Sequence, residues 1–81
     1  MKTAELARIL ADTNVPSDAY SLEGGLPNEA FCIGRESSGG RWEVYYSERG
    51  RKSGLRTFDS EDEACGHFIE MMREAGVLQW N

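Results

Sequence analysis

The sequence predicts an α+β fold, in which a three- to four-stranded antiparallel meander lies between an N-terminal and a C-terminal helix packed on one face (α-β-β-β(-β)-α). Three observations predict it. Apolar residues recur at helical spacing near both ends, alternating aromatic and β-branched residues fill the middle, and glycine-rich turns separate these segments. A chain of 81 residues can close only one hydrophobic core, so residues 1–81 are expected to form a single domain.

The first helix is predicted over residues 4–13. Leu6, Ile9 and Leu10 lie at the i, i+3, i+4 spacing of one apolar stripe. Pro16 follows soon after, and the residue before a proline is driven out of helical backbone geometry. The helix is therefore expected to end before it.

Four short segments have the composition of strands, and the strongest of them contains Trp42, Val44 and Tyr46 on one face. The short connections between the segments favour antiparallel pairing. A polar, glycine-containing loop is expected over residues 48–54. The predicted strands are residues 20–22, 30–34, 41–46 and 55–58.

Alternation along these strands assigns their side chains to two faces. An antiparallel sheet tolerates one solvated face, so only one set is expected in the core. The set predicted to face the helices is Phe31, Ile33, Trp42, Val44, Tyr46 and Leu55. The set predicted to face solvent is Cys32, Glu43, Tyr45 and Arg56.

The second helix is predicted over residues 61–75. Ser60 and Glu63 have the spacing of a capping box, and Gly76 suits the position just beyond a helix end. The tail, residues 77–81, is apolar enough that we expect it to pack back on the domain. Apolar residues at helical spacing within the helix are Ala64, Phe68, Ile69 and Met72.

Charge is distributed unevenly along the chain. The formal net charge is −5, yet six bases and three acids between Arg35 and Arg56 give this stretch +3, which leaves −8 on the rest. A basic centre with acidic ends suits a protein that presents opposite signs on different surfaces, and a solvated basic hairpin explains it equally well. No apolar run reaches the length of a membrane span, and no secretory signal is visible, so we expect a cytoplasmic protein.

The residue types that could support catalysis do not form a recognisable motif. His67 with Cys32 or Cys65 would need an orienting third group, and a zinc site normally needs four clustered ligands. Neither glycine pair has the spacing of a phosphate-binding loop. The acids of residues 61–63 are explained by helix capping. We therefore expect no catalytic residue, no metal and no cofactor.

A nucleic-acid partner is disfavoured by charge. The order helix–strands–helix matches the double-stranded RNA-binding domain, but residues 59–63 place acids where that domain offers a basic helix start to phosphates. The alternative that remains open is a small dimeric regulatory or RNA-associated module. The strand at 55–58 or at 20–22 would then lie at a sheet edge, where it could pair with a second copy or with the partner.

A protein-binding module is the interpretation that the residues favour. Tyr45 on the exposed face and Trp80 in the tail are aromatic side chains of the type that interfaces favour. The loop Glu48–Lys52 has both charge signs and can set partner choice through charge-assisted hydrogen bonds.

The run Trp42–Gly50 (WEVYYSERG), followed by Phe58–Cys65 (FDSEDEAC), resembles small bacterial immunity proteins that are encoded beside polymorphic or secreted toxins. Together with Tyr20–Leu22 and the glycine-rich loop after it, the resemblance covers residues 20–72. It implies a protein that binds and inhibits a cognate antibacterial toxin without catalysis of its own. It also suggests an NAD+ glycohydrolase as the toxin, blocked at its active-site cleft.

The resemblance implies a 1:1 complex of a monomer with the toxin, and fast association steered by charge. The mixed-charge loop would enter the toxin's cleft, where its bases pair with carboxylates and Glu48 pairs with toxin bases. The residues expected to lead the contact are Tyr45, Glu48, Arg49, Arg51 and Lys52, with the loop Glu23–Asn28, including Glu23 and Asn28, second.

Overall fold

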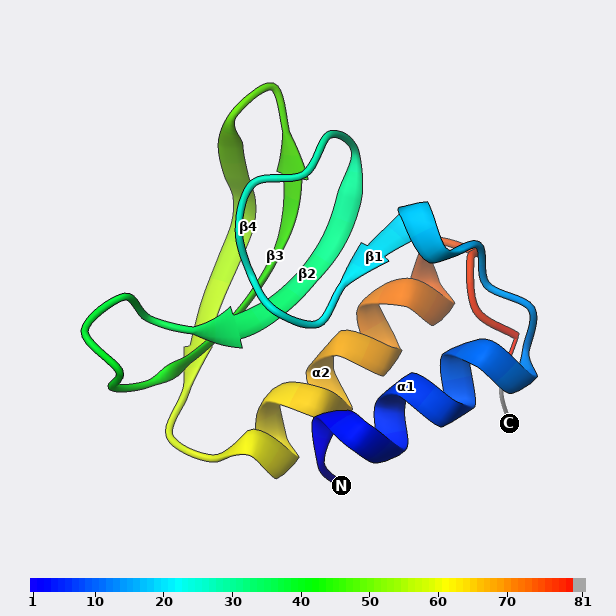
Figure 1. The fold of residues 1–81 in the computed structure, drawn as a ribbon, viewed down its shortest axis with the longest axis horizontal. Coiled ribbons are helices and arrows are strands. Elements are labelled where there is room, and N and C mark those ends of the chain that lie inside the picture. The colour runs from blue at the N-terminus through cyan, green and yellow to red at the C-terminus, as the bar shows by residue number, and fades with distance from the viewer. Residues whose placement is uncertain (80–81) are drawn as a thin grey trace.

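The computed structural model describes residues 1–79 and confirms the predicted α+β fold (Figure 1). Two helices flank a four-stranded sheet, and a single turn of 3-10 helix precedes the first strand. The elements in chain order are α1 (Thr3–Asp12), η1 (Ser17–Ala19), β1 (Tyr20–Ser21), β2 (Ala30–Arg35), β3 (Trp42–Glu48), β4 (Arg51–Phe58) and α2 (Glu61–Glu74).

Both helices form where the apolar stripes predict them. Leu6 and Leu10 of α1 are fully buried. The capping box of α2 is also present, because the Ser60 hydroxyl oxygen accepts a hydrogen bond from the Glu63 N–H at 3.1 Å. The starts of the two helices are joined by the Thr3 N–H, which donates to a carboxylate oxygen of Glu61 at 2.8 Å.

The sheet has the order β1-β2-β3-β4, and its β2–β3 and β3–β4 pairs are antiparallel as predicted. The expected all-antiparallel meander is wrong at one point, since β1 pairs with β2 in parallel, with Tyr20 opposite Phe31. The cause is the connection between them, residues 22–29, which we call the cover loop. It runs back across the sheet, where the Gly24 N–H donates to the Ile33 carbonyl at 3.0 Å, and so enters β2 in the direction of β1.

The polar loop expected over residues 48–54 is also wrong, because β4 begins at Arg51. A two-residue turn of Arg49 and Gly50, both with left-handed backbone (φ 50° and 73°), joins β3 to β4 and pairs Glu48 with Arg51. Turns of this form match the twist of the two strands that they join. Farther along, the register shifts between the Val44 and Tyr46 pairs, so β4 contains a bulge.

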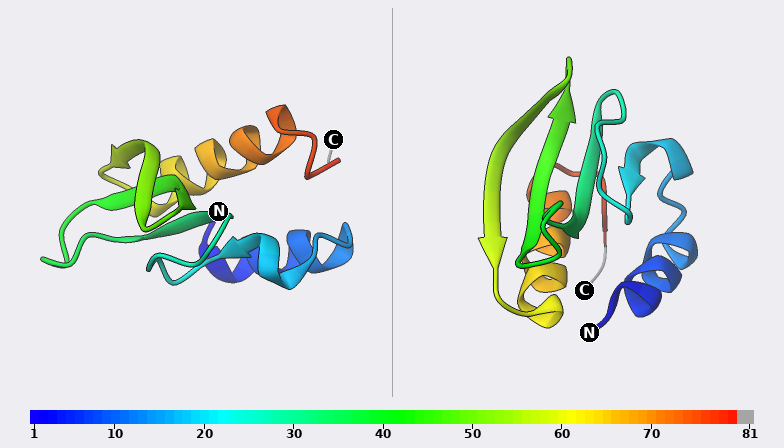
Figure 2. Two further views of the ribbon diagram at one scale, coloured as in Figure 1. Left: turned by 90° about the horizontal axis from the view of Figure 1, so that it is seen from above. Right: turned by 60° about the vertical axis from the view of Figure 1, so that its left-hand side comes forward.

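The hydrophobic core lies between the helices and one face of the sheet (Figure 2). Helix α2 crosses β2, β3 and β4, while α1 packs beside α2. Leu78 is buried as well, so the tail packs back as far as the structure describes it; Trp80 and Asn81 lie outside the described residues. The buried core residues are Leu6, Leu10, Val15, Ile33, Val44, Ala64, Cys65, Phe68, Ile69, Met72 and Leu78.

The predicted inward face is correct in its centre and wrong at its edge. Ile33 and Val44 are fully buried, and Phe31 and Trp42 pack against them. Tyr46 is half-buried and meets Phe31 edge to face, with ring centroids 4.9 Å apart. Leu55, however, is 44 % exposed, because it lies within the bulge of the edge strand.

Three of the four residues predicted on the outward face lie on the side away from the helices, but their expected exposure to solvent is wrong. Cys32 and Tyr45 are buried, since the cover loop lies over this side of the sheet. Glu43 is largely shielded as well, with 14 % of its side chain exposed. Arg56 is exposed but lies opposite Val44 in the register, on the helix-facing side, because the bulge reverses the alternation of β4. Within residues 1–79 neither helix has the length and apolar character of a membrane span.

Candidate functional site

The cover loop is held close to the sheet by glycines. Gly24 has left-handed backbone (φ 70°), and a Cβ atom added to Gly34 of β2 would lie only 2.8 Å from the backbone of Gly24. Glycine at position 34 therefore permits the two backbones to approach each other directly. The loop becomes a second layer on the side of the sheet that faces away from the helices.

Tyr45 of β3 lies between the sheet and the cover loop and holds the loop in place through a hydrogen bond. Its hydroxyl donates to the Gly25 carbonyl at 2.6 Å, and the Lys52 ammonium lies over its ring, 4.9 Å from the centroid. Burial raises the pKa of Tyr45 to about 12. Tyr45 was predicted to lead contact with a partner; the structure instead places it as a buried support.

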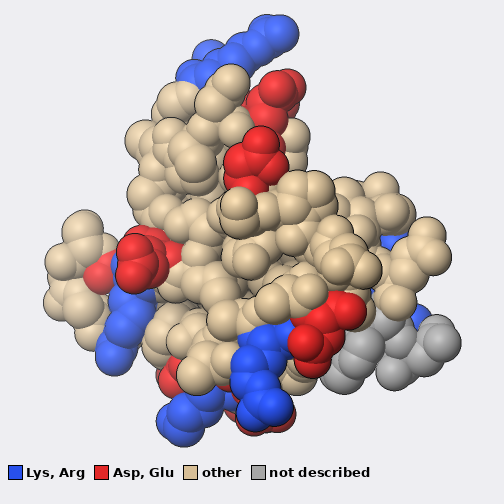
Figure 3. Space-filling view, turned by 45° about the vertical axis from the view of Figure 1, so that its right-hand side comes forward, with Lys and Arg blue, Asp and Glu red and all other residues tan. Residues whose placement is uncertain are grey.

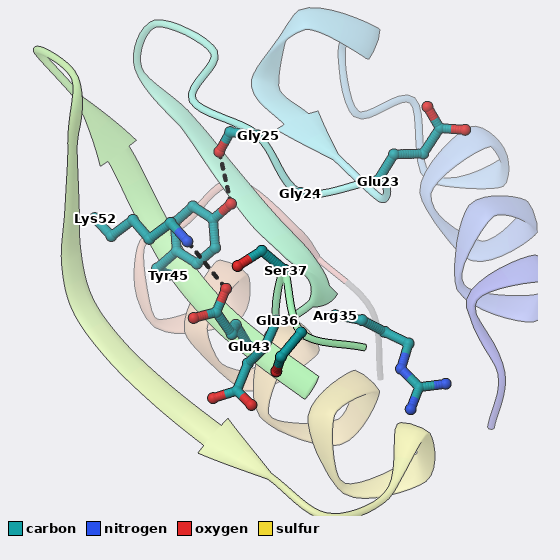
Figure 4. A pocket seen from close by; sticks show the side chains of 10 residues that line it. Glu23, Gly24, Gly25, Arg35, Glu36, Ser37, Glu43, Tyr45 and Lys52 are labelled. Atoms are coloured by element: carbon teal, nitrogen blue, oxygen red, sulfur yellow. Dashed lines mark hydrogen bonds and ion pairs between the residues drawn. The ribbon is translucent and has the colours of Figure 1, made fainter. Parts of the chain in front are cut away.

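Lys52 packs against Tyr45 beneath the cover loop and pairs with Glu43. Its ammonium donates to a Glu43 carboxylate oxygen at 3.0 Å beside Tyr45, so one of the predicted contact bases is already paired. These groups line a hollow of about 440 Å³ between the cover loop and the turn before β3, drawn in Figure 4. Arg35 at its edge donates to the carbonyls of Gly39 and Gly40 at 2.7 and 2.8 Å. The bases of the hollow are thus engaged within the chain.

A different surface forms where the cover loop and the β3–β4 turn meet at one end of the sheet (Figure 1). We call this surface, residues 26–29 and 48–51, the sheet tip. Ser47, fully buried, donates its hydroxyl hydrogen to the Pro27 carbonyl at 2.6 Å and so joins the two segments. Leu26 is 54 % exposed beside them, which makes it the most exposed large apolar side chain within residues 1–79.

The charges of the sheet tip are available to a partner. Arg49 and Arg51 are exposed and form no ion pair within residues 1–79. Glu48 accepts a hydrogen bond from the Ser53 hydroxyl at 3.2 Å. Figure 3 shows basic side chains projecting from the upper end of the molecule, with acidic side chains directly below them.

The backbone of the sheet tip is strained. Within residues 1–79, three residues other than glycine have left-handed backbone: Asn14, Glu29 and Arg49. Two of them, Glu29 and Arg49, lie in the sheet tip. Such conformations are costly for residues with a side chain, persist where the surrounding structure holds them, and cluster at binding sites.

The residues considered for catalysis lie apart from the sheet tip. Cys32 and Cys65 are free, buried thiols, and burial raises the pKa of Cys65 to about 11 and that of Cys32 in the same direction. His67 packs against Phe58 with ring centroids 5.2 Å apart, and burial together with nearby Arg56 lowers its pKa. Within residues 1–79 no group of three or more His, Cys, Asp or Glu side chains could hold a metal ion.

The predicted contact residues therefore separate into two groups. Asn28, Glu48, Arg49 and Arg51 come together at the sheet tip, where Leu26 and Glu29 join them without having been predicted individually. Leu26 could have been found as the single apolar side chain between a glycine pair and a proline. The other predicted residues, Glu23, Tyr45 and Lys52, line the hollow.

Comparison with known proteins identified no relative. No family model, no curated protein and no solved structure matches this chain.

Proposed function

We propose that this chain is an immunity protein, which binds a cognate antibacterial toxin in a 1:1 complex and inhibits it by occluding the active-site cleft. The observation that supports this function is the composition of the sheet tip. Two exposed arginines without an ion pair within residues 1–79, the carboxylates of Glu29 and Glu48, and an exposed leucine lie together on two segments that the Ser47–Pro27 hydrogen bond joins.

A rigid projecting tip suits inhibition by insertion. Leu26 supplies apolar area, and arginine forms paired hydrogen bonds with carboxylates that line a catalytic cleft. Because Ser47 and the two-residue turn fix the tip before binding, little conformational entropy remains to be lost on docking. The net charge of −5 would also steer the chain toward a basic toxin.

We further propose an NAD+ glycohydrolase as the toxin. An active site that recognises the phosphates and ribose of NAD+ combines basic and acidic groups, and the tip offers a partner for each through Glu48 and its two arginines. The alternative, a dimeric regulatory or RNA-associated module, has less support, since Glu61–Glu63 at the start of α2 would repel phosphates.

The test is growth rescue. The toxin domain encoded beside the gene for this chain is expressed with wild-type chain, with Arg49→Glu/Arg51→Glu, or with the control Arg8→Glu/Arg73→Glu, which changes the net charge equally on the helices. Wild type and control should restore growth, and the tip variant should not. Rescue by the tip variant would move the interface elsewhere, and cellular NAD+ that stays constant during intoxication would contradict the proposed toxin chemistry.

A further inference from the structure

Strand β4 forms one edge of the sheet. Its single strand neighbour is β3, and its eight residues are mostly exposed. The opposite edge, β1, has only two residues, so β4 is by far the longer edge. An edge strand leaves every second backbone N–H and carbonyl unpaired on its outer side.

The outward groups of β4 can be assigned from the register. Glu48 and Arg51 flank a two-residue turn, so they form a hydrogen-bonded pair, and pairs of that type alternate with open ones along the strands. The backbone groups of Lys52, opposite Ser47, and of Thr57, opposite Glu43, therefore point away from β3. Within residues 1–79, no loop or side chain forms a hydrogen bond with the β4 backbone at this edge.

The positive charge of the β4 edge favours an acidic binding partner over a second copy of this chain. Residues 51–58 contain three bases, Arg51, Lys52 and Arg56, and no acid. Pairing of two copies through β4 would bring six bases together, and like charges across paired strands are destabilising. An acidic segment paired with β4 would instead be attracted by the same three bases.

We propose that the outer edge of β4 binds an extended acidic segment of a partner protein by strand addition. Main-chain hydrogen bonds at Lys52 and Thr57 would give the affinity, and Arg51 and Arg56, which form no ion pair within residues 1–79, would select acidic side chains. The edge begins at Arg51, which also belongs to the sheet tip, so one partner could occupy both surfaces. Only the identity of that partner rests on the proposed function.

The experiment uses the whole chain and a synthetic peptide of alternating glutamate and valine. Binding is followed by NMR of ¹⁵N-labelled protein at millimolar peptide, where a Kd of about 1 mM is measurable. We expect chemical-shift changes concentrated in residues 51–58, and slower hydrogen exchange at the Lys52 and Thr57 amides. A lysine–valine peptide should bind about tenfold more weakly or not at all.

Two matched changes test the backbone contribution. Thr57→Pro removes an outward N–H without removing a β3 pair, and should weaken binding about tenfold, whereas Thr57→Val should bind as wild type. If the proline variant does not fold, a peptide N-methylated at alternate amides replaces it and should fail to bind wild type.

Three results would overturn the proposal: shift changes outside β4 or none at all, equal binding of both peptides, or a dimer of the free chain that buries β4. The outcomes also distinguish this proposal from the proposed function. Peptide binding without growth rescue would support strand addition at β4 and contradict the toxin-binding function. Growth rescue that depends on Arg49 and Arg51, without peptide binding, would support the toxin-binding function and contradict strand addition.

Discussion

Ser47 and Pro27 are joined by a hydrogen bond of 2.6 Å that links the end of β3 to the loop covering the sheet. Ser47 is a fully buried polar side chain. Its hydroxyl therefore holds the two segments of the sheet tip in one arrangement. A partner would meet a preformed surface.

Ser47→Ala should lower the free energy of unfolding by about 1–2 kcal/mol, because the Pro27 carbonyl loses its donor in a shielded position. Urea denaturation measures this change. Ser53→Ala, which removes the more exposed hydrogen bond to Glu48, serves as the control and should cost less than about 0.5 kcal/mol. Equal losses in the two variants would contradict the role given to Ser47.

Gly34→Ala should displace the cover loop, since the added methyl group would meet the Gly24 backbone at 2.8 Å. We expect a loss of about 1–3 kcal/mol of stability and faster hydrogen exchange at the Gly24 amide, which bonds to Ile33. Gly66→Ala is the matched control: nothing lies within 4 Å of its added Cβ, and alanine in a helix should stabilise by about 0.5–1 kcal/mol. An unperturbed Gly24 amide in the first variant would refute the close approach.

These two sites illustrate what the sequence could predict. The helices and the central strands follow from periodicity, because each of these elements buries one side in the core, and the Ser60 cap of α2 follows from its local motif. The burial of Tyr45 did not follow, since it depends on residues 22–29 crossing the sheet, and contacts between segments distant in sequence leave no local pattern. The strand Arg51–Gly54 did not follow either, because an exposed edge imposes no alternation and because none of its four residues is β-branched or aromatic.

Part of the candidate site could be predicted from composition, and the rest depends on contacts between segments that are distant in sequence. The charged turn Glu48–Arg51 could be identified from composition, since its residues are exposed. The separation of Lys52 from that turn could not, because it results from the pairing of Lys52 with Glu43 across the strands. The position of Asn28 beside the turn depends on the path of the cover loop.

Glu61→Gln should reduce stability in a pH-dependent manner. The Thr3 N–H lowers the pKa of the Glu61 carboxyl in the folded chain, so this carboxylate stabilises the fold above its unfolded pKa of about 4.3 and loses that contribution as the pH falls further. The difference in urea midpoint between wild type and variant should be largest near pH 7 and should shrink between about pH 5 and 3. Glu70→Gln, on the exposed side of α2, is the control, and a difference that persists at low pH would contradict this assignment.

Both thiols should be unreactive in the folded chain. With the pKa of Cys65 at about 11, about one thiol in a thousand is ionised at pH 8, and burial blocks access as well. Labelling with iodoacetamide should therefore be slow in buffer and complete within minutes in denaturant. Rapid labelling of either cysteine in the folded chain would reopen the question of thiol chemistry.

The central claim is that the sheet tip binds the toxin, and titration calorimetry with the purified toxin domain tests it most directly. Arg49→Glu/Arg51→Glu should bind about a hundredfold more weakly than wild type, since central interface arginines often contribute 1–2 kcal/mol each or more. The control Arg8→Glu/Arg73→Glu should stay within about threefold of wild type. Equal affinities for wild type and the tip variant would contradict the account.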